Sequence, residues 1–175
     1  MKRLLTTLVI LTGLFAPSLA VGGEVVKFSD LVERGGLYYK PFTDEPFTGK
    51  MEGSMQYTFR RGKKHGPSVW YYENGQLEMK GTYKDGKPEG PFVFYHENGQ
   101  LRGKETWKDG EREGPWVRYH QNGQLWKKGI YKDGKREGPW VFYNEDGTKD
   151  MDGKGGRDLG HEGTGTYRND KKVSD

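Results

Sequence analysis

A block of Gly, Pro, one aromatic residue and Val recurs at a fixed interval of 24 residues along this chain. Three nearly identical copies begin at Gly90, Gly114 and Gly138, and a weaker copy with Ser in the aromatic position begins at Gly66. A fixed period in this range indicates a repeat array in which each unit packs mainly on its neighbours. The function is therefore to be sought in what the copies present together.

Two turn signals keep the same period. Asn-Gly occurs at 74–75, 98–99 and 122–123 with Asp-Gly in the fourth place at 146–147, and a second series of Asp-Gly pairs occurs at 85–86, 109–110 and 133–134. Between these turns, Phe92–His96 and Gln100–Trp107 are rich in residues that favour strands. The sequence therefore predicts an all-β fold, an antiparallel meander of tandem 24-residue β-hairpin repeats in a single layer. We expect Asn98-Gly99 to form a two-residue turn with positive φ at both positions.

Counting outward from that two-residue turn gives the cross-strand pairs of the hairpin. Phe94 then faces Gly103, and Tyr95 faces Arg102. Strand alternation puts mostly large apolar groups and Gly on one side, which we expect to be the packing face: Phe92, Phe94, His96, Leu101, Gly103, Glu105 and Trp107. The other side is mixed and expected to be solvated: Val93, Tyr95, Arg102, Lys104 and Thr106. A slip of one residue would exchange the two faces, so the assignment depends on the turn type.

Equivalent positions in successive repeats form rows across the predicted sheet, about 10 Å apart. On the solvated face these rows hold Tyr71, Tyr95, Tyr119 and Tyr143, flanked by Lys80, Lys104 and Lys128. Tyr offers a flat apolar ring with a polar tip, and a row of Lys favours anionic partners, so these seven residues are the candidate binding surface. A structural interpretation stays open, in which cross-strand Tyr–Lys and Tyr–Arg pairs stabilise an exposed sheet.

The first twenty residues have the layout of a secretory signal peptide. Lys2 and Arg3 precede an apolar stretch, residues 4–15, that is short for a membrane-spanning helix, and Ser18-Leu19-Ala20 offers small residues for cleavage. We therefore expect the protein to be exported and to be periplasmic or secreted. The chain has no Cys, so its stability must come from sheet pairing and stacked aromatic rings.

Four segments follow from these signals. Residues 1–20 are the predicted signal peptide, 21–56 a degenerate N-terminal repeat that acts as a cap, 57–147 the hairpin repeats, and 148–175 a Gly-rich flexible tail with a partial repeat. Removing Lys2 and Arg3 lowers the formal net charge from +4 to +2, too small to indicate nucleic-acid binding. The packing face needs cover from sheet curvature, from the caps or from a second copy of the chain, so a homodimer stays open.

A catalytic centre would need acids, bases or nucleophiles that converge on one point. Glu89, Glu113 and Glu137 precede Gly-Pro in three repeats, and a spacing of one repeat is too wide for joint action on one bond. We assign them to ion pairing in loops with nearby Lys and Arg. His96 and His120 occupy equivalent positions and are expected about 10 Å apart, too far to share a zinc ion. The sequence therefore predicts no enzyme.

Residues 150–153 (Asp-Met-Asp-Gly) resemble part of a calcium-binding loop. Setting Gly153 at the sixth position places Thr148 at the first and Leu159 at the twelfth, where carboxylate ligands are needed. Both ligand positions fail. We therefore predict no metal site and no cofactor.

The repeat unit resembles the membrane occupation and recognition nexus (MORN) repeat. The likeness is to its bacterial variant form, found in YwqK-type antitoxins of toxin–antitoxin systems, and it covers about residues 57–147. The residues that carry it are Tyr-x-x-Asn-Gly-Gln-Leu-x-x-Lys-Gly-x-Tyr-Lys-Asp-Gly-Lys-x-Glu-Gly-Pro-Trp. The resemblance implies a β-hairpin solenoid used for binding, with links to lipid surfaces and protein partners, and the antitoxin label implies neutralising a toxin by direct contact.

These features together predict a non-catalytic exported repeat scaffold that binds a protein or envelope partner. Two alternatives stay open. One is a YwqK-type antitoxin or immunity-like protein that neutralises a toxin by direct contact. The other is a module that binds an anionic lipid or glycan surface through the Lys row.

Overall fold

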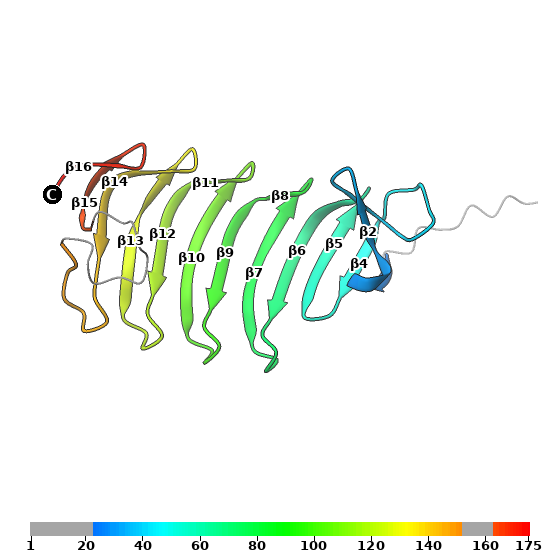
Figure 1. Cartoon of the computed structure of the whole chain (residues 1–175), viewed down its shortest axis with the longest axis horizontal. Helices are drawn as coiled ribbons and strands as arrows, with labels where there is room; N and C mark the ends of the chain where they lie inside the picture. The colour runs from blue at the N-terminus through cyan, green and yellow to red at the C-terminus, as the bar shows by residue number, and fades with distance from the viewer. Residues whose placement is uncertain (1–22, 152–162) are drawn as a thin grey trace, which may run out of the picture.

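Fourteen strands join one sheet in the computed structural model, which describes residues 23–151 and 163–175 (Figure 1). In the order in which they lie, the main strands are β1 (Glu24–Lys27), β4 (Gly49–Glu52), β5 (Met55–Arg60), β6 (Lys63–Tyr71), β7 (Leu77–Lys84), β9 (Gly90–Tyr95), β10 (Leu101–Lys108), β12 (Gly114–Tyr119), β13 (Leu125–Lys132), β14 (Lys135–Phe142), β15 (Gly165–Arg168) and β16 (Lys171–Ser174). Two short strands lie beside this path, β8 (Lys87–Pro88) on β7 and β11 (Glu111–Arg112) on β10. The predicted all-β hairpin meander is confirmed.

The N-terminal end departs from the simple meander. Strand β1 pairs with β4 in the parallel direction, and the chain between them forms a 3-10 turn, η1 (Phe28–Asp30), and a separate two-stranded sheet. That small sheet pairs β2 (Val32–Arg34) with β3 (Leu37–Tyr39). No helix in the described part of the chain is long and apolar enough to cross a membrane.

The predicted two-residue turn at Asn98-Gly99 is wrong. Gly99 has a φ of +81°, whereas Asn98 keeps a negative φ. The backbone N–H of Gly99 donates to the carbonyl of His96 at 2.8 Å, and the N–H of His96 donates to the carbonyl of Gln100 at 2.8 Å, so the loop has three residues. The turn with two positive φ values lies at the other edge of the sheet, where Asp109 has +52° and Gly110 has +91°.

A β-bulge after the three-residue loop restores the predicted register. Tyr95 pairs with Leu101 and Phe94 pairs with Gly103, which leaves Arg102 as the extra residue on its strand. The pairs from Gly103 onward are therefore as predicted. The predicted faces of Leu101 and Arg102 are wrong, because Leu101 lies opposite Tyr95 while the guanidinium of Arg102 lies 5.5 Å from the Phe94 ring centre.

The side of the sheet that carries Phe92, Trp116 and Trp140, here called the aromatic face, is the packing face. These three rings are buried, with 4%, 8% and 2% of their surface exposed. Phe92 lies against Gly81, Trp140 lies against Gly129, and Trp116 lies against Glu105, each on the preceding strand. A Cβ added to Gly81 would lie 2.4 Å from the Phe92 ring, and one added to Gly129 would lie 2.2 Å from Trp140. Glycine is therefore required there so that the ring of one repeat can lie on the preceding strand.

The aromatic face is covered at both ends of the array. At the N-terminal end, Val26, Leu31 and Phe47 pack on Tyr57 and Phe59 in one buried cluster. At the C-terminal end, a second cluster contains the following rings: Trp116, Trp140, Phe142 and Tyr167. The ring of Tyr167 comes from β15, the strand formed by the predicted partial repeat.

Side chains link each repeat to the next at the Asn-Gly edge. Asn98 Oδ1 accepts from the N–H of Gln100 at 3.0 Å, and Asn98 Nδ2 donates to the carbonyl of Gln121 in the next repeat at 3.0 Å. Asn74 and Asn122 make the same pairs of bonds. The Asn amide is needed because it serves one donor in its own turn and one acceptor in its neighbour.

We expect Gly129→Ala to lower the free energy of unfolding by about 1–3 kcal/mol, because the new methyl group overlaps the Trp140 ring. Urea unfolding followed by tryptophan fluorescence measures the change. The matched control is Lys128→Ala, the exposed neighbour on the opposite side of the same strand, for which we expect a change within about 0.5 kcal/mol. Equal stabilities for the two variants would contradict the packing described.

We expect Asn98→Asp to destabilise the protein by about 1 kcal/mol, because a carboxylate keeps the local turn but cannot donate to the Gln121 carbonyl. Thermal unfolding compares it with the reverse change, Asp146→Asn, at the last position of the same row. Asp146 accepts from Thr148 N at 2.8 Å, and no further hairpin turn lies beside it at this edge in the described residues. The reverse change should therefore leave the melting temperature nearly unchanged.

Candidate functional site

The structure places all seven predicted binding residues on one side of the sheet, here called the tyrosine–lysine face. Its members are Tyr71, Tyr95, Tyr119, Tyr143, Lys80, Lys104 and Lys128. The Lys side chains are exposed and the Tyr side chains are half-buried. Each central Lys stands between two Val residues of the neighbouring strands, as Lys104 does between Val93 and Val117. Each of the first three Tyr residues lies opposite a Leu, as Tyr95 does opposite Leu101.

Tyr and Lys are therefore not direct cross-strand partners on this face. One row across the strands alternates Lys with Val, and the neighbouring row contains Tyr and Leu. A shallow hollow of about 360 Å³ lies on the same side over β12, β13 and β14, and Pro115, Val117, Ile130 and Val141 are among its lining residues. The face thus combines a row of cations with apolar patches.

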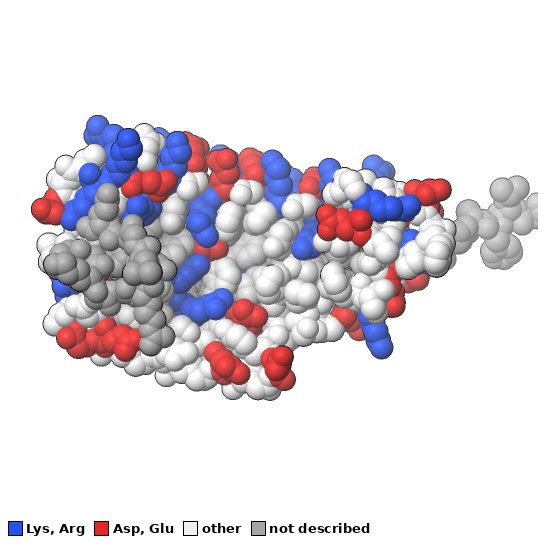
Figure 2. All heavy atoms as spheres, viewed as in Figure 1, with Lys and Arg blue, Asp and Glu red and all other residues white. Residues whose placement is uncertain are grey.

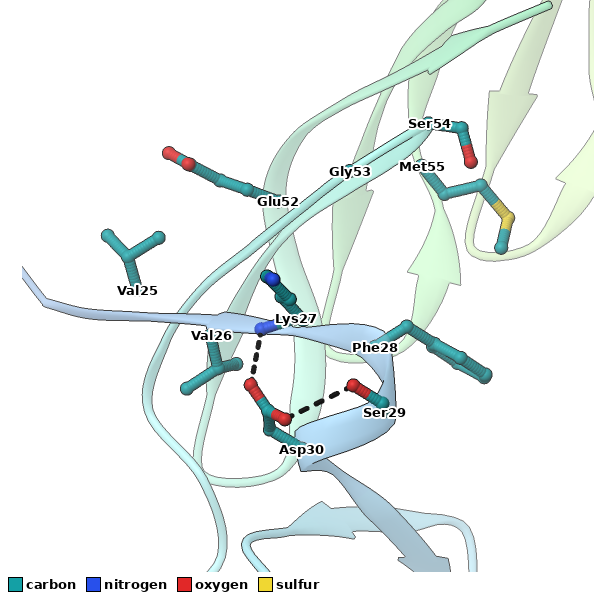
Figure 3. A pocket seen from close by; sticks show the side chains of 10 residues that line it. All are labelled: Val25, Val26, Lys27, Phe28, Ser29, Asp30, Glu52, Gly53, Ser54 and Met55. Carbon is teal, nitrogen blue, oxygen red and sulfur yellow. Dashed lines mark hydrogen bonds between the residues drawn. The ribbon is translucent and has the colours of Figure 1, made fainter. Parts of the chain in front are cut away.

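A second hollow lies at the N-terminal end of the sheet and has a volume of about 590 Å³ (Figure 3). It is lined by residues 25–30 from β1 and η1 and by residues 52–55 from the β4–β5 turn. The side chain of Phe28 is 58% exposed at its rim. The carboxylate of Asp30 accepts from Lys27 N at 2.9 Å and from Ser29 Oγ at 3.1 Å, so it holds the 3-10 turn together. The hollow offers apolar contact rather than an acid–base pair.

The Glu residues before Gly-Pro hold turns together. Glu89 Oε2 accepts from the N–H of Asp109 at 2.9 Å, and Glu113 Oε2 accepts from the N–H of Asp133 at 2.9 Å. Glu137 makes the same bond to Asn169 at 3.2 Å. The partner in each case is a backbone N–H of the next turn, whereas the sequence suggested Lys and Arg partners.

Each His in the central repeats also links two neighbouring repeats. His96 Nε2 lies 2.9 Å from the carbonyl of Tyr119, and His120 Nε2 lies 3.0 Å from the carbonyl of Tyr143. Tyr72 occupies the same position one repeat earlier and donates its hydroxyl to the carbonyl of Tyr95 at 2.8 Å. No group of three His, Cys, Asp or Glu in the described ranges is arranged to hold a metal ion. Most of the calcium-like segment falls outside those ranges, since it continues beyond residue 151.

A His–Asp pair lies at the Asp-Gly turn that follows β7. The carboxylate of Asp85 accepts from Arg60 at 2.9 Å and lies 3.1 Å from His65 Nδ1. The hydrogen bond from Arg60 lowers the pKa of Asp85, and His65 adds to the effect. His65 takes the place that Glu89 has in the next repeat, and its Nδ1 lies 3.3 Å from the backbone N–H of Asp85. The pair therefore serves the same turn as Glu89 does.

Sequence analysis did not identify a cluster of charged side chains in the middle of the aromatic face. Glu105 is 4% exposed and stands in the row where Gly81 and Gly129 stand in the neighbouring repeats. Its carboxylate accepts from Trp107 Nε1 at 2.9 Å, from Trp116 Nε1 at 2.8 Å and from Arg118 at 2.6 Å. The sequence signal for this site is a Glu at a position where the neighbouring repeats have Gly.

Cations surround this carboxylate and lie over aromatic rings. The Arg118 guanidinium is 4.4 Å from the Trp116 ring centre and 4.7 Å from that of Phe94. Arg112 lies 5.0 Å from the Trp107 ring centre, and its Nε is 3.5 Å from Glu105 Oε2. Burial lowers the pKa of Arg118, and the charge of Glu105 opposes that shift. We call this cluster the arginine–tryptophan patch, comprising Arg102, Glu105, Trp107, Arg112, Trp116, Arg118, Trp126 and Lys127.

Comparison with protein families matches the MORN repeat variant at residues 64–85, 88–109 and 112–133. The chain contains three MORN repeats. Each match begins two residues before a Gly-Pro block and ends at the Asp of the next Asp-Gly turn, so each MORN repeat supplies one Asn-Gly hairpin of the sheet. Arg102, Glu105 and Trp107 of the arginine–tryptophan patch lie in the second repeat, and its other five members lie in the third.

Comparison with solved structures finds a chain of the GtfA/B complex bound to UDP and GlcNAc, with 11% identity and a TM-score of 0.24. The similarity covers 68% of this chain and 22% of that chain, so this chain spans about a fifth of its length. A likeness of this size carries no argument about the MORN repeats. The search of curated proteins finds no match.

We expect Glu105→Gln to lower the free energy of unfolding by roughly 2–3 kcal/mol, because Arg118 and Arg112 lose their buried counter-charge. The double variant Glu105→Gly/Arg118→Phe introduces the residues that the preceding repeat has at the equivalent positions, Gly81 and Phe94. We expect the double variant to be more stable than the single variant. Urea unfolding of both variants checks the order. A double variant as unstable as the single one, or less stable, would contradict the assigned charge pairing.

Proposed function

We propose that this protein is a non-catalytic exported scaffold that binds a protein partner, in the cell envelope or outside the cell, through its tyrosine–lysine face. The observation that carries the proposal is the row formed by Lys80, Lys104 and Lys128. All three side chains are exposed, and their strands belong to one continuous sheet, which fixes the spacing of the charges.

The surroundings of the Lys row support a binding surface for protein. Each Lys stands between Val residues, and the Tyr row adds half-buried rings with polar tips along the same side. Aromatic and apolar groups provide contact area at protein interfaces, while cations at their edge favour acidic partners and guide the approach. A rigid sheet presents such groups without a cost of ordering the backbone on binding.

The bonds of the acid–base residues support a use without catalysis. Glu89, Glu113, His96 and His120 each bond to the backbone of a neighbouring repeat. A catalytic group must instead face a substrate within hydrogen-bond reach. Export rests on the predicted signal peptide at residues 1–20, which lie outside the described residues.

We expect the triple variant Lys80→Gln/Lys104→Gln/Lys128→Gln to lose the partner captured by crosslinking and pull-down from the protein's own envelope fraction, because the anionic partner loses three matched cations. The control is Lys84→Gln/Lys108→Gln/Lys132→Gln. It removes the same charge from exposed residues with the same spacing, four residues further along the same strands at the Asp-Gly edge. Equal capture by wild type and the first variant would refute the role of the row.

Two other functions share the same surface and need their own tests. An anionic lipid surface is favoured by the exposed Lys row and would give salt-sensitive binding to anionic liposomes that the first triple variant loses.

An antitoxin or immunity-like role is favoured by the likeness of the repeats to those of YwqK-type antitoxins. It requires that co-expression protect cells from the product of a neighbouring toxin gene, and failure to protect would remove it.

A further inference from the structure

The Asn-Gly loops contain the dipeptide in which an asparagine most readily loses its side-chain amide. Asn74, Asn98 and Asn122 are each followed by Gly, and all of them are exposed to water. In this reaction, deamidation, the backbone nitrogen of the following residue attacks the side-chain carbonyl carbon of Asn. Gly favours the attack because it has no side chain to obstruct it and its backbone is the most flexible. The array therefore repeats a reactive dipeptide along one edge.

Deamidation of Asn98 needs only water as a reactant. The Gly99 nitrogen gives its proton to hydroxide and forms a bond to Cγ of Asn98. The bond from Cγ to Nδ2 then breaks, and Nδ2 takes a proton from water and leaves as ammonia. Water opens the resulting succinimide ring at either of its carbonyl groups, which leaves an aspartate or an isoaspartate. Nothing is oxidised or reduced, so no cofactor is required.

Hydrogen bonds hold Asn98 away from this reaction. The N–H of Gly99 donates to the carbonyl of His96 at 2.8 Å, so the proton that must be lost is engaged. Asn98 Oδ1 accepts from the N–H of Gln100 at 3.0 Å, and Nδ2 donates to the carbonyl of Gln121 at 3.0 Å. Both ends of the amide are therefore held, and Cγ can turn toward the Gly99 nitrogen only after the loop opens locally.

The bond to the next repeat gives this protection a direction along the chain. Asn74 donates to the carbonyl of Glu97, which belongs to the loop of Asn98. Asn98 donates to the carbonyl of Gln121, which belongs to the loop of Asn122. Each Asn amide is thus held by the loop that follows it, so a loop that loses its own anchor also releases the Asn one repeat earlier.

The product of the reaction is poorly accommodated at this edge. A carboxylate keeps the local turn but has no donor for the carbonyl of the next repeat. Loops 73–76, 97–100 and 121–124 contain no Lys or Arg that could pair with it. Figure 2 shows acidic and uncharged atoms along the lower edge of the middle strands, where Figure 1 places these loops. A new carboxylate therefore adds to the negative charge of Glu73 and Glu97.

We propose that Asn74, Asn98 and Asn122 are deamidation sites controlled by the neighbouring repeat, so that conversion of one loop makes the Asn one repeat earlier reactive. Loss of the Asn122 amide removes the donor that anchors its loop on the Glu145 carbonyl. The Gln121 carbonyl in that loop is the partner of Asn98, which is then released. Deamidation proceeds along the edge from the last Asn-Gly loop toward the first, and it does not depend on the tyrosine–lysine face.

Peptide mass spectrometry of the purified protein, kept in mildly alkaline buffer, measures the conversion of each Asn. We expect all of these sites to convert about tenfold or more slowly in the folded protein than in guanidinium chloride, because the folded chain must first open the loop. Equal rates in the folded and the unfolded protein would overturn the proposed protection.

The direction of the effect is tested by Asn122→Asp, with Asn74→Asp as the matched control. We expect Asn122→Asp to raise the initial conversion rate of Asn98 about threefold or more, because residues in one hydrogen-bond network are coupled. The control makes the same chemical change one repeat before Asn98 and leaves the bonds of the Asn98 amide in place, so the rate should be unchanged.

The conversion of Asn98 and that of Asn74 in the Asn122→Asp variant separate local release from general unfolding. Local release raises the initial rate at Asn98 alone. A rise of equal size at Asn74 would indicate unfolding of the whole array and would refute the proposal. An Asn98 rate that both variants raise equally, or that neither raises, would refute it as well.

Discussion

The contact between an aromatic ring and the bare backbone of the preceding strand is the constraint on which the array depends. Phe92 lies on Gly81 and Trp140 lies on Gly129, at distances that exclude any Cβ. The rings then touch those of the return strands, as Tyr131 touches Trp140 with 5.1 Å between ring centres. A single-layer sheet has no second layer to bury its side chains, so this close approach supplies the burial that a core gives in other folds.

The regularity of one face and the irregularity of the other have different physical origins. On the tyrosine–lysine face, Lys and Val alternate across the strands, and no position needs a particular neighbour in order to fit. On the aromatic face, a charged residue in the glycine row changes what its neighbours must be. Glu105 requires donors, and Trp107, Trp116 and Arg118 provide them. The second and third repeats are therefore coupled in a way that the other repeats are not.

Much of the fold followed from the sequence because the period ties each turn to its strands. The strand pairs from Gly103 to Trp107 were correct even though the turn that set them was not. The reason is that the extra loop residue and the bulge at Arg102 cancel, and no local propensity distinguishes this pair of changes from a simple two-residue turn. In each repeat, the error affected only the two positions after the turn, those of Leu101 and Arg102 in this hairpin. The charged patch was not predicted, because assigning faces by repeat treated Glu105 as an exception, although a Glu in the glycine row is the signal that marks it.

The two functions of the Asn side chain also determine where the array can be lengthened. Inside the array, each Asn finds a carbonyl one repeat away, so a hairpin duplicated between two others would meet a matching acceptor on one side and a matching donor on the other. A hairpin joined after Gly147 would instead bring its carbonyl against the carboxylate of Asp146, and two acceptors repel. Asp146 therefore marks the end of the row. Growth of the scaffold is chemically straightforward by internal duplication, whereas growth at this end needs a change of residue first.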